Sequence, residues 1–135
     1  MQRRIFLLAG AGASLIRADT REALIELFGS MAGALSEGNA AAFLRAIDPS
    51  MSGYGEFAGN VRALIAQNSL SSSIEILKQD GDDNKQSVEL DWLLEITKGS
   101  ILRRQGVVKF RLELRKKQWR IIDLDPRDFF APPAQ

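Results

Sequence analysis

The chain lacks two residue types entirely, because it contains no cysteine and no histidine. Without cysteine it can form neither a disulfide nor a thiolate metal site. Without histidine it has neither the commonest general base nor the commonest metal ligand. Nucleophilic mechanisms that use a serine–histidine–aspartate or a cysteine–histidine set are therefore excluded. We expect no metal site and no cofactor.

Basic and acidic residues are nearly equal in number. The chain has 18 basic and 17 acidic residues, a formal net charge of +1 at pH 7. This balance gives no reason to expect a nucleic acid as a partner. The 135 residues, of which 45% are apolar and 26% are charged, are typical of one soluble globular domain with a core of its own.

The longest uncharged run lies at the start of the chain. Met1–Arg4 is a short basic segment, and Ile5–Ile16 follows as twelve residues without charge. A run of this length is too short to span a bilayer, which needs about 20 apolar residues, but it matches the core of a signal peptide. Arg3-Arg4-Ile5-Phe6-Leu7 also resembles the twin-arginine export signal.

We therefore expect residues 1–18 to be a cleaved export signal and residues 19–135 to be the mature domain. The mature domain would be periplasmic or secreted and would have no membrane span. Cleavage after Ala18 places Ile16 where a small residue is preferred, and Ala13 offers a second cleavage site. The alternative is an N-terminal helix that packs on the domain.

Three helices are predicted after this segment. The helical spacing of apolar residues predicts them over residues 19–35, 40–47 and 56–68. Gly38 and its neighbours end the first helix, and Asn39 has the side chain to cap the second.

Four strands are predicted to follow the helices. Alternating apolar and polar residues indicate strands over residues 71–78, 88–96, 108–114 and 119–124. The acidic turn at residues 79–84 invites a calcium-binding interpretation. However, it lacks the ligand spacing and the distal glutamate of an EF-hand loop, so we interpret it as a solvated hairpin turn.

The two central strands carry opposite charges on one face. A hairpin that turns at Lys98-Gly99-Ser100 would place Glu89 and Asp91 near Arg111 and Lys109. Such cross-strand pairs contribute roughly 0.2–1 kcal/mol each. They favour one register, because a shift by one residue would bury the charges.

The pattern between Ile101 and Val108 is less regular, and the register there stays open. Gly106 interrupts this stretch and is a candidate for a β-bulge.

Helices followed by strands indicate an α+β fold, here three N-terminal helices packed on a curved four-stranded antiparallel sheet. Three features carry a resemblance to a known family: this order of elements, the last strand with Trp119, and the segment Phe129–Pro132 that follows it. The chain from Thr20 to Pro132 resembles the nuclear transport factor 2-like superfamily. That group includes ketosteroid isomerase-like and polyketide cyclase-like proteins. The resemblance implies a cystatin-like fold whose sheet forms a cone that often encloses a pocket. It also implies a homodimer that pairs through the outer face of the sheet.

Three polar residues are candidates for chemistry in such a cone. The isomerase branch uses a carboxylate base with a tyrosine and a protonated acid as hydrogen-bond donors, and no residue-by-residue match to that set is present. The candidates are Asp123 or Asp48 as a base and Tyr54 as a donor. Asp123 would point inward if Trp119 and Ile121 do.

We predict that Tyr54, Trp92, Phe110 and Asp123 line a ligand pocket. Each has a plainer interpretation. Tyr54 can be a rim aromatic with its hydroxyl in water, and Trp92 and Phe110 can simply pack in the core. Asp123 can be an exposed carboxylate at a strand end, and Asp48 can be a turn residue before a proline.

Three functions remain in competition, because this fold hosts many unrelated activities. The first, which we favour, is an exported non-catalytic domain that binds a small apolar or amphipathic ligand in a cone-shaped pocket or serves as a dimeric accessory module. The second is an enzyme of the isomerase, cyclase or dehydratase type. The third is an interaction surface on the basic strands, because residues 98–120 contain nine basic residues and one acid, Glu113.

Overall fold

The computed structural model describes residues 18–134 and has its elements in the predicted order. The helices are α1 (Ala18–Glu37), α2 (Ala40–Leu44) and α3 (Tyr54–Gln67). The strands are β1 (Ser69–Gly81), β2 (Lys85–Lys98), β3 (Ser100–Arg115) and β4 (Gln118–Asp125), and a short 3-10 helix, η2 (Arg127–Phe130), follows them. The predicted α+β class is confirmed. Apart from Ala18, the predicted export signal lies outside the described residues and stays a prediction.

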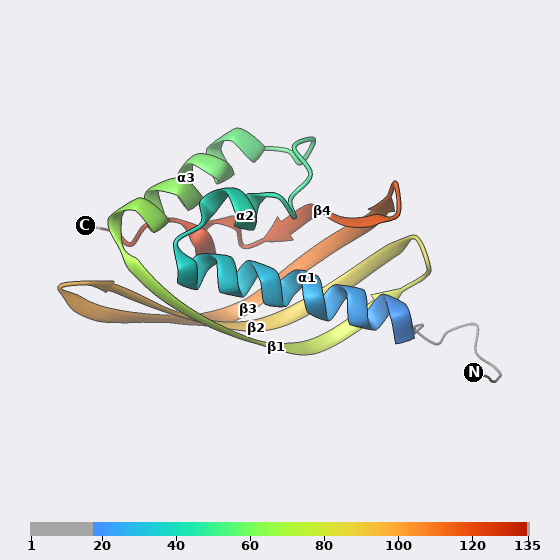
Figure 1. Ribbon diagram of the computed structural model, residues 1–135, viewed down its shortest axis with the longest axis horizontal. Coiled ribbons are helices and arrows are strands. Elements are labelled where there is room, and N and C mark those ends of the chain that lie inside the picture. The colour runs from blue at the N-terminus through green and yellow to red at the C-terminus, as the bar shows by residue number, and fades with distance from the viewer. Residues whose placement is uncertain (1–17, 135) are drawn as a thin grey trace.

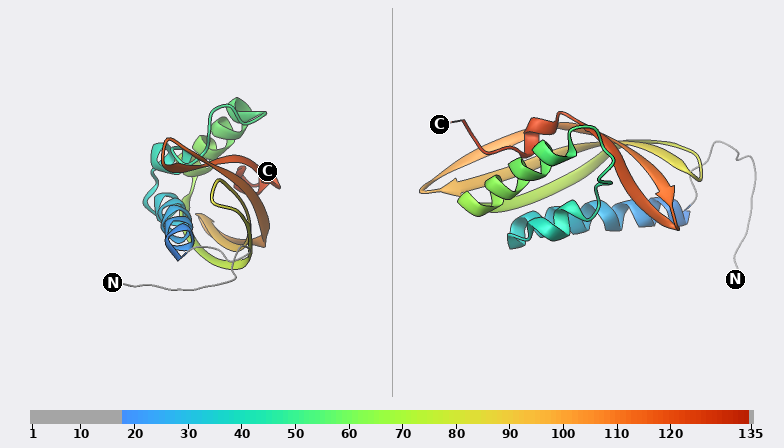
Figure 2. Two further views of the ribbon diagram at one scale, coloured as in Figure 1. Left: turned by 90° about the vertical axis from the view of Figure 1, so that its right-hand side faces the viewer. Right: turned by 90° about the horizontal axis from the view of Figure 1, so that it is seen from above.

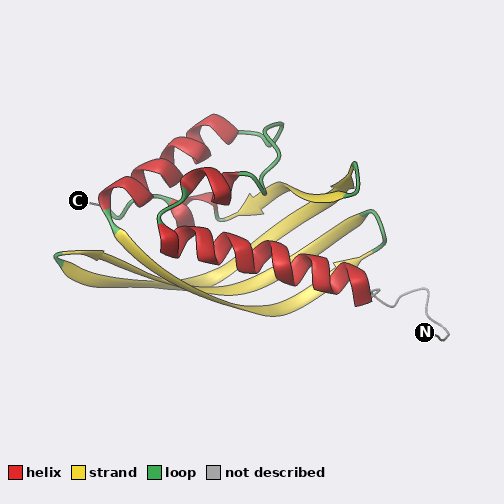
Figure 3. Ribbon diagram, in the orientation of Figure 1, coloured by secondary structure: helices red, strands yellow, loops and turns green. Residues whose placement is uncertain are grey.

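The four strands form one antiparallel sheet in chain order, β1-β2-β3-β4. All three helices lie over the same face of this sheet (Figure 1). Seen end-on, the sheet curls around them, so that β4 approaches the helices from the side opposite β1 (Figure 2). The tip of the β2–β3 hairpin extends past the ends of the helices (Figure 3). Within residues 18–134, no helix has both the length and the apolar character needed to cross a bilayer.

The boundary between α1 and α2 follows the predicted capping chemistry. Gly38 takes a left-handed φ of 73° and ends α1. The side-chain oxygen of Asn39 then accepts a hydrogen bond of 3.0 Å from the amide of Ala42. The predicted cap on the second helix is confirmed.

The second helix is shorter than predicted, because the chain after it joins the sheet. Ile47 forms a parallel β-bridge with Ile121 of β4. The amide of Asp48 donates to the carbonyl of Ile121 at 2.8 Å, and the amide of Ile121 donates to the carbonyl of Ala46 at 2.9 Å. This bridge fixes the α2–α3 loop against β4.

The register of the central hairpin differs by two residues from the predicted charge pairing. Glu89 lies opposite Lys109 and not opposite Arg111. Asp91 lies opposite Val107, and its carboxylate accepts a hydrogen bond of 3.0 Å from Gln105. Arg111 lies opposite Ser87 instead.

The predicted bulge at Gly106 is wrong, because β2 and β3 pair without interruption from their turn to their far ends. Gly106 lies opposite Trp92, and a Cβ placed on it would be 3.5 Å from the ring of Phe129. This is an ordinary van der Waals distance, so the packing of η2 on the sheet does not itself require glycine here. The strand register shifts at two other places: between Ile76 and Lys78 in β1, and between Arg111 and Leu112 where β3 pairs with β4.

Candidate functional site

Aromatic rings fill the space between the sheet and the helices. Trp92 and Phe110 are 0% and 1% exposed. Their ring centroids lie 6.2 Å apart, and each contacts a further ring: Phe110 contacts Phe28 of α1 at 4.8 Å, and Trp92 contacts Phe130 of η2 at 5.0 Å. The indole nitrogen of Trp92 donates to Ser72 at 2.7 Å. Trp92 and Phe110 therefore form part of the core, which agrees with the plainer of their two interpretations.

Asp123 faces away from the core, contrary to the sequence prediction. Trp119 and Ile121 do point inward and are buried. Between them and Asp123 the pairing shifts, because Leu112 opposes Ile121 while Arg111 opposes Asp123. The additional residue, Ile122, reverses the alternation. Asp123 therefore shares the outer face of the sheet with Arg111.

Two arginines hold the Asp123 carboxylate on that outer face. Arg127 donates to one oxygen at 2.7 Å, and Arg111 donates to the other at 3.3 Å. These hydrogen bonds, that from Arg127 first, lower the pKa of Asp123 below its ordinary value. A carboxylate with a lowered pKa is a poor general base at neutral pH.

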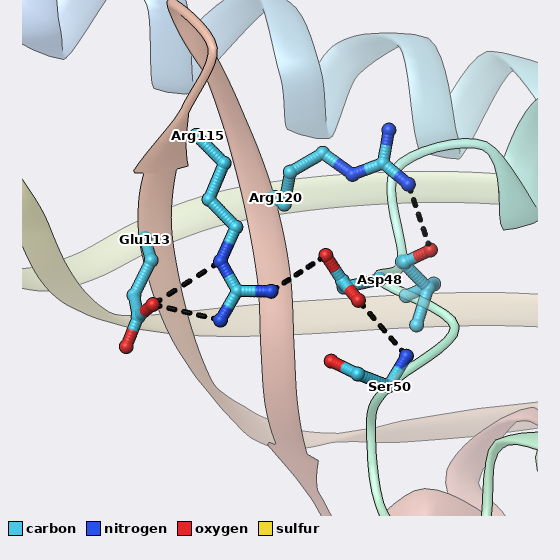
Figure 4. Close-up of polar contacts among 6 residues, drawn as sticks. Asp48, Ser50, Glu113, Arg115 and Arg120 are labelled. Atoms are coloured by element: carbon cyan, nitrogen blue, oxygen red, sulfur yellow. Dashed lines mark hydrogen bonds and ion pairs between the residues drawn. The ribbon is translucent and has the colours of Figure 1, made fainter.

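Asp48 is also held as an ion, in the loop that the Ile47–Ile121 bridge fixes to β4 (Figure 4). One carboxylate oxygen accepts from the amide of Ser50 at 2.9 Å, and the other accepts from Arg115 at 2.8 Å. Arg115 also binds Glu113 at 2.8 Å. Hydrogen bonds from Ser50 and Arg115 lower the pKa of Asp48 to about 2. This arrangement clamps the β3–β4 turn to the α2–α3 loop.

The Asp48 clamp leads to a prediction about acid stability. We expect Asp48→Asn to lower the free energy of unfolding at pH 7 by about 1 kcal/mol, near the upper value for a partly exposed ion pair. The carboxyl has a pKa of about 2 in the folded protein and an ordinary value of 3.8. Its contribution is therefore complete above pH 3.8 and is lost as the pH falls to about 2.

Urea unfolding between pH 7 and pH 2 measures this effect. The gap between the native protein and Asp48→Asn should close across the acid window. Asp80→Asn is a suitable control, because Asp80 is an exposed carboxylate whose ion-pair partner, at 3.8 Å, is Lys78 and not a residue bound to Asp48. A gap that stays constant down to pH 2 would show that the charge of Asp48 does not stabilise the fold.

Tyr54 lies apart from both carboxylates. It is half-buried at the start of α3 and lines a hollow of about 340 Å³ between α2, α3 and β4. Neither Asp48 nor Asp123 lines this hollow. Asp123 lines a different hollow, of about 390 Å³, on the outer face of the sheet. Among the described residues, the predicted acid–base set thus does not come together at one site.

Three arginines line the Tyr54 hollow, and the sequence analysis did not single out two of them. Arg45 follows α2 and Arg62 lies on α3, and both side chains are exposed. Arg120 comes from β4 and is partly buried. No motif joins these positions, because they meet only when the α2–α3 loop binds to β4.

The basic residues of β3 and β4 do not form one continuous patch. Arg103 pairs with Glu95 at 2.9 Å on the outer face of the sheet. Arg104 lies on the inner face and donates to the carbonyls of Phe129 and Ala131 at 2.6 and 2.7 Å. Arg111 and Arg115 are ion-paired as described above. Three of the nine basic residues of the predicted interaction surface are therefore ion-paired within the chain, and a fourth, Arg104, is bound to carbonyl groups.

No family model and no curated protein is similar to this chain in sequence. Solved structures are similar in fold. A conserved protein from Planctomyces limnophilus has a TM-score of 0.74 at 9% identity, over 80% of this chain and 94% of that one. An NTF2-like protein with a cystatin-like fold from Novosphingobium aromaticivorans has a TM-score of 0.62 at 12% identity, over 78% and 79%.

The chain has the nuclear transport factor 2-like, cystatin-like fold. The resemblance predicted from the sequence is confirmed at this level. A proposed scytalone dehydratase from Novosphingobium aromaticivorans shares the fold with a TM-score of 0.67 at 10% identity, over 78% of this chain and 81% of that one. At these identities the similarity shows the fold, and function has to be argued from residues.

Proposed function

We propose that this protein is a non-catalytic accessory domain that acts as a homodimer, paired through the outer face of its sheet. The observation that carries the proposal is the distribution of charge on that face. At its centre the acids stand on β1 and β2 and the bases stand on β3. These acids are Glu75, Glu89, Asp91 and Glu95, and these bases are Arg103, Lys109 and Arg111. Elsewhere on the same face Lys78 and Lys85 add bases, and Glu113, Asp123 and Asp125 add acids. Arg103 and Arg111 are also ion-paired within the chain.

A two-fold axis makes this face self-complementary. In a symmetric dimer the same surface of both copies meets itself in opposite orientation. The central acids of one copy can then face the central bases of the other, which favours one docking orientation. The helices cover only the other face of the sheet in the described part of the chain, so the outer face is accessible to a partner (Figure 2).

Apolar residues lie among these charges. Val107 is 44% exposed on β3, and Leu93 lies diagonally across from it on β2, half-buried. Diagonal neighbours on one face lie close enough for their side chains to interact. An apolar centre with a charged rim is the usual arrangement of a protein interface.

The filled interior supports a non-catalytic role. Trp92 and Phe110 occupy the place where a ligand or substrate would enter a cone. Both candidate bases have lowered pKa values and lie in ion pairs away from Tyr54. The dehydratase-like chemistry proposed for one structural neighbour would need an acid–base set at a common cavity, and the described residues do not supply one.

The dimer is tested by substituting the centre of the outer face. We expect Val107→Glu to weaken dimerisation at least about tenfold, because two unpaired carboxylates would be buried at the symmetric contact. Light scattering after gel filtration over a range of concentrations measures the dissociation constant.

Leu102→Glu is the matched control for Val107→Glu. Leu102 is on the same strand, is 46% exposed, and points to the opposite side of the sheet. The Leu102→Glu variant should therefore leave the dimer intact. A native protein that remains monomeric at millimolar concentration, or equal effects of the two variants, would refute this interface.

We also propose that the domain is exported and that residues 1–18 serve as the signal. The basic start, the uncharged run and the arginine pair support this role. N-terminal sequencing of the protein recovered outside the cytoplasm tests it. A product that still begins at Met1 would contradict cleavage.

A further inference from the structure

We propose that the hollow between α2, α3 and β4 binds a small organic anion through Arg45, Arg62 and Arg120. The hollow has a volume of about 340 Å³, within the range of small-molecule sites. Its lining combines the three arginines and Tyr54 with four aliphatic residues. Among the described residues that line it, none is acidic.

The arginines of this hollow differ from the others in their partners. Elsewhere, four arginines form ion pairs with carboxylates: Arg103, Arg111, Arg115 and Arg127. Within residues 18–134, Arg45 and Arg62 form no ion pair. Two exposed guanidinium groups that line one hollow without a carboxylate create a positive potential there, which an anion would neutralise. Arg45 also borders the neighbouring groove that Glu26 and Glu37 line.

Arg120 adds a partly buried donor to this group. Its Nη2 donates only a long hydrogen bond, 3.5 Å, to the carbonyl of Ile47. Its Nε is buried and has no acceptor in the described structure. Figure 4 shows its second terminal nitrogen pointing away from Ile47. A polar group removed from water without an acceptor is unfavourable, and an oxyanion held by the same guanidinium would offset part of that cost through charge-assisted hydrogen bonds.

The position of Arg120 is fixed before any ligand arrives. Its neighbour Ile121 forms the β-bridge with Ile47, and both residues are buried. Arg45 directly follows α2 and Arg62 lies on α3, the two helices that flank this bridge. One guanidinium on a fixed backbone and two on exposed side chains suit a carboxylate or a phosphate, whose oxygens accept several guanidinium hydrogens.

The rest of the lining indicates an amphipathic ligand. Leu44 and Ile47 form an apolar floor and are 5% and 1% exposed. Pro49 stands at the rim. The Tyr54 side chain lines the same hollow, and its hydroxyl can donate a further hydrogen bond. The expected ligand therefore carries one carboxylate or phosphate and a short apolar tail.

This site does not depend on the proposed dimer. Seven of its eight lining residues come from α2, α3 and the loop between them, and the eighth, Arg120, stands on the edge strand β4. The proposed dimer uses the outer face of β1, β2 and β3. A failure of one proposal therefore leaves the other to be judged on its own measurement.

Titration of the full chain with octanoate, octyl phosphate and octanol tests the site, with calorimetry as the readout. We expect saturable binding of one anion per chain and binding of the neutral alcohol at least about tenfold weaker. Arg45→Gln and Arg62→Gln should each weaken binding of the anions about tenfold. Both residues are exposed, so neither variant should lower the melting temperature appreciably.

Arg103→Gln is the matched control, because Arg103 is equally exposed but is paired with Glu95 on the outer face of the sheet. It should leave the affinity within about twofold of the native value. The proposal is overturned if no anion saturates, if octanol binds equally well, or if Arg103→Gln weakens binding as much as Arg45→Gln. Binding to anionic lipid vesicles without binding to the soluble anions would also overturn it, because it would indicate a membrane surface.

Discussion

Trp92→Ala is expected to lower the free energy of unfolding by about 3–5 kcal/mol, the usual cost of truncating a large buried aromatic residue. The side chain is fully buried and contacts the rings of Phe110 and Phe130. Its loss would leave a cavity between the sheet and η2 and would also leave the Ser72 hydroxyl without its indole donor. The same residue would be tolerant of truncation if it lined an open ligand pocket, so the variant distinguishes a core from a binding site.

Urea unfolding monitored by far-ultraviolet circular dichroism measures this effect. Trp119→Ala is a useful comparison, because Trp119 is 9% exposed and lines an open groove between α1 and the start of β4. Its truncation should cost less, since the side chain is not enclosed on all sides. A loss below about 1 kcal/mol for Trp92→Ala would contradict the filled interior and reopen the cone as a ligand site.

Gly81→Ala is expected to cost about 2–4 kcal/mol, because a disfavoured backbone conformation and a backbone clash act together. Gly81 has a φ of 140° at the end of β1. A Cβ at this position would be 2.1 Å from the carbonyl oxygen of Lys85 and 2.8 Å from the Cα of Gln86. Backbone atoms held by the β1–β2 pairing cannot move away as a flexible side chain would.

Gly99→Ala separates these two causes. Gly99 also has a positive φ, 83°, but a Cβ there would meet nothing within 4 Å. It should cost only about 1–2 kcal/mol, the penalty for a left-handed conformation alone. Thermal and urea unfolding of both variants give the comparison, and equal losses would show that the clash at Gly81 is relieved by movement of the turn.

The filled interior changes how the fold should be interpreted. A cone-shaped sheet over helices is associated with pockets, yet here the large rings of Trp92, Phe110 and Phe130 meet in its centre. The two surfaces proposed above are therefore external. One is the outer face of the sheet, and the other is the hollow lined by Arg45, Arg62 and Arg120.

The order of the elements and the two faces of the central strands could be predicted from the sequence. Alternation with a period of two is a local property, and it correctly assigned Leu90, Trp92 and Val108 to the buried face. The caps around Gly38 and Asn39 are also local, since each depends on contacts within a few residues. The strands extend beyond their predicted ends. Pairing with a neighbouring strand keeps the backbone extended where apolar and polar residues no longer alternate.

The positions of the functional side chains depended on the tertiary structure. Asp123 faces outward only because Ile122 is unpaired opposite β3, and the local alternation of β4 contains no sign of that extra residue. Arg45, Arg62 and Arg120 come together only because the loop after α2 bridges to Ile121. The sequence by itself therefore determined the α+β class and the buried face of the sheet. Long-range backbone pairing decided which charges are neutralised within the chain and which remain free to bind a partner.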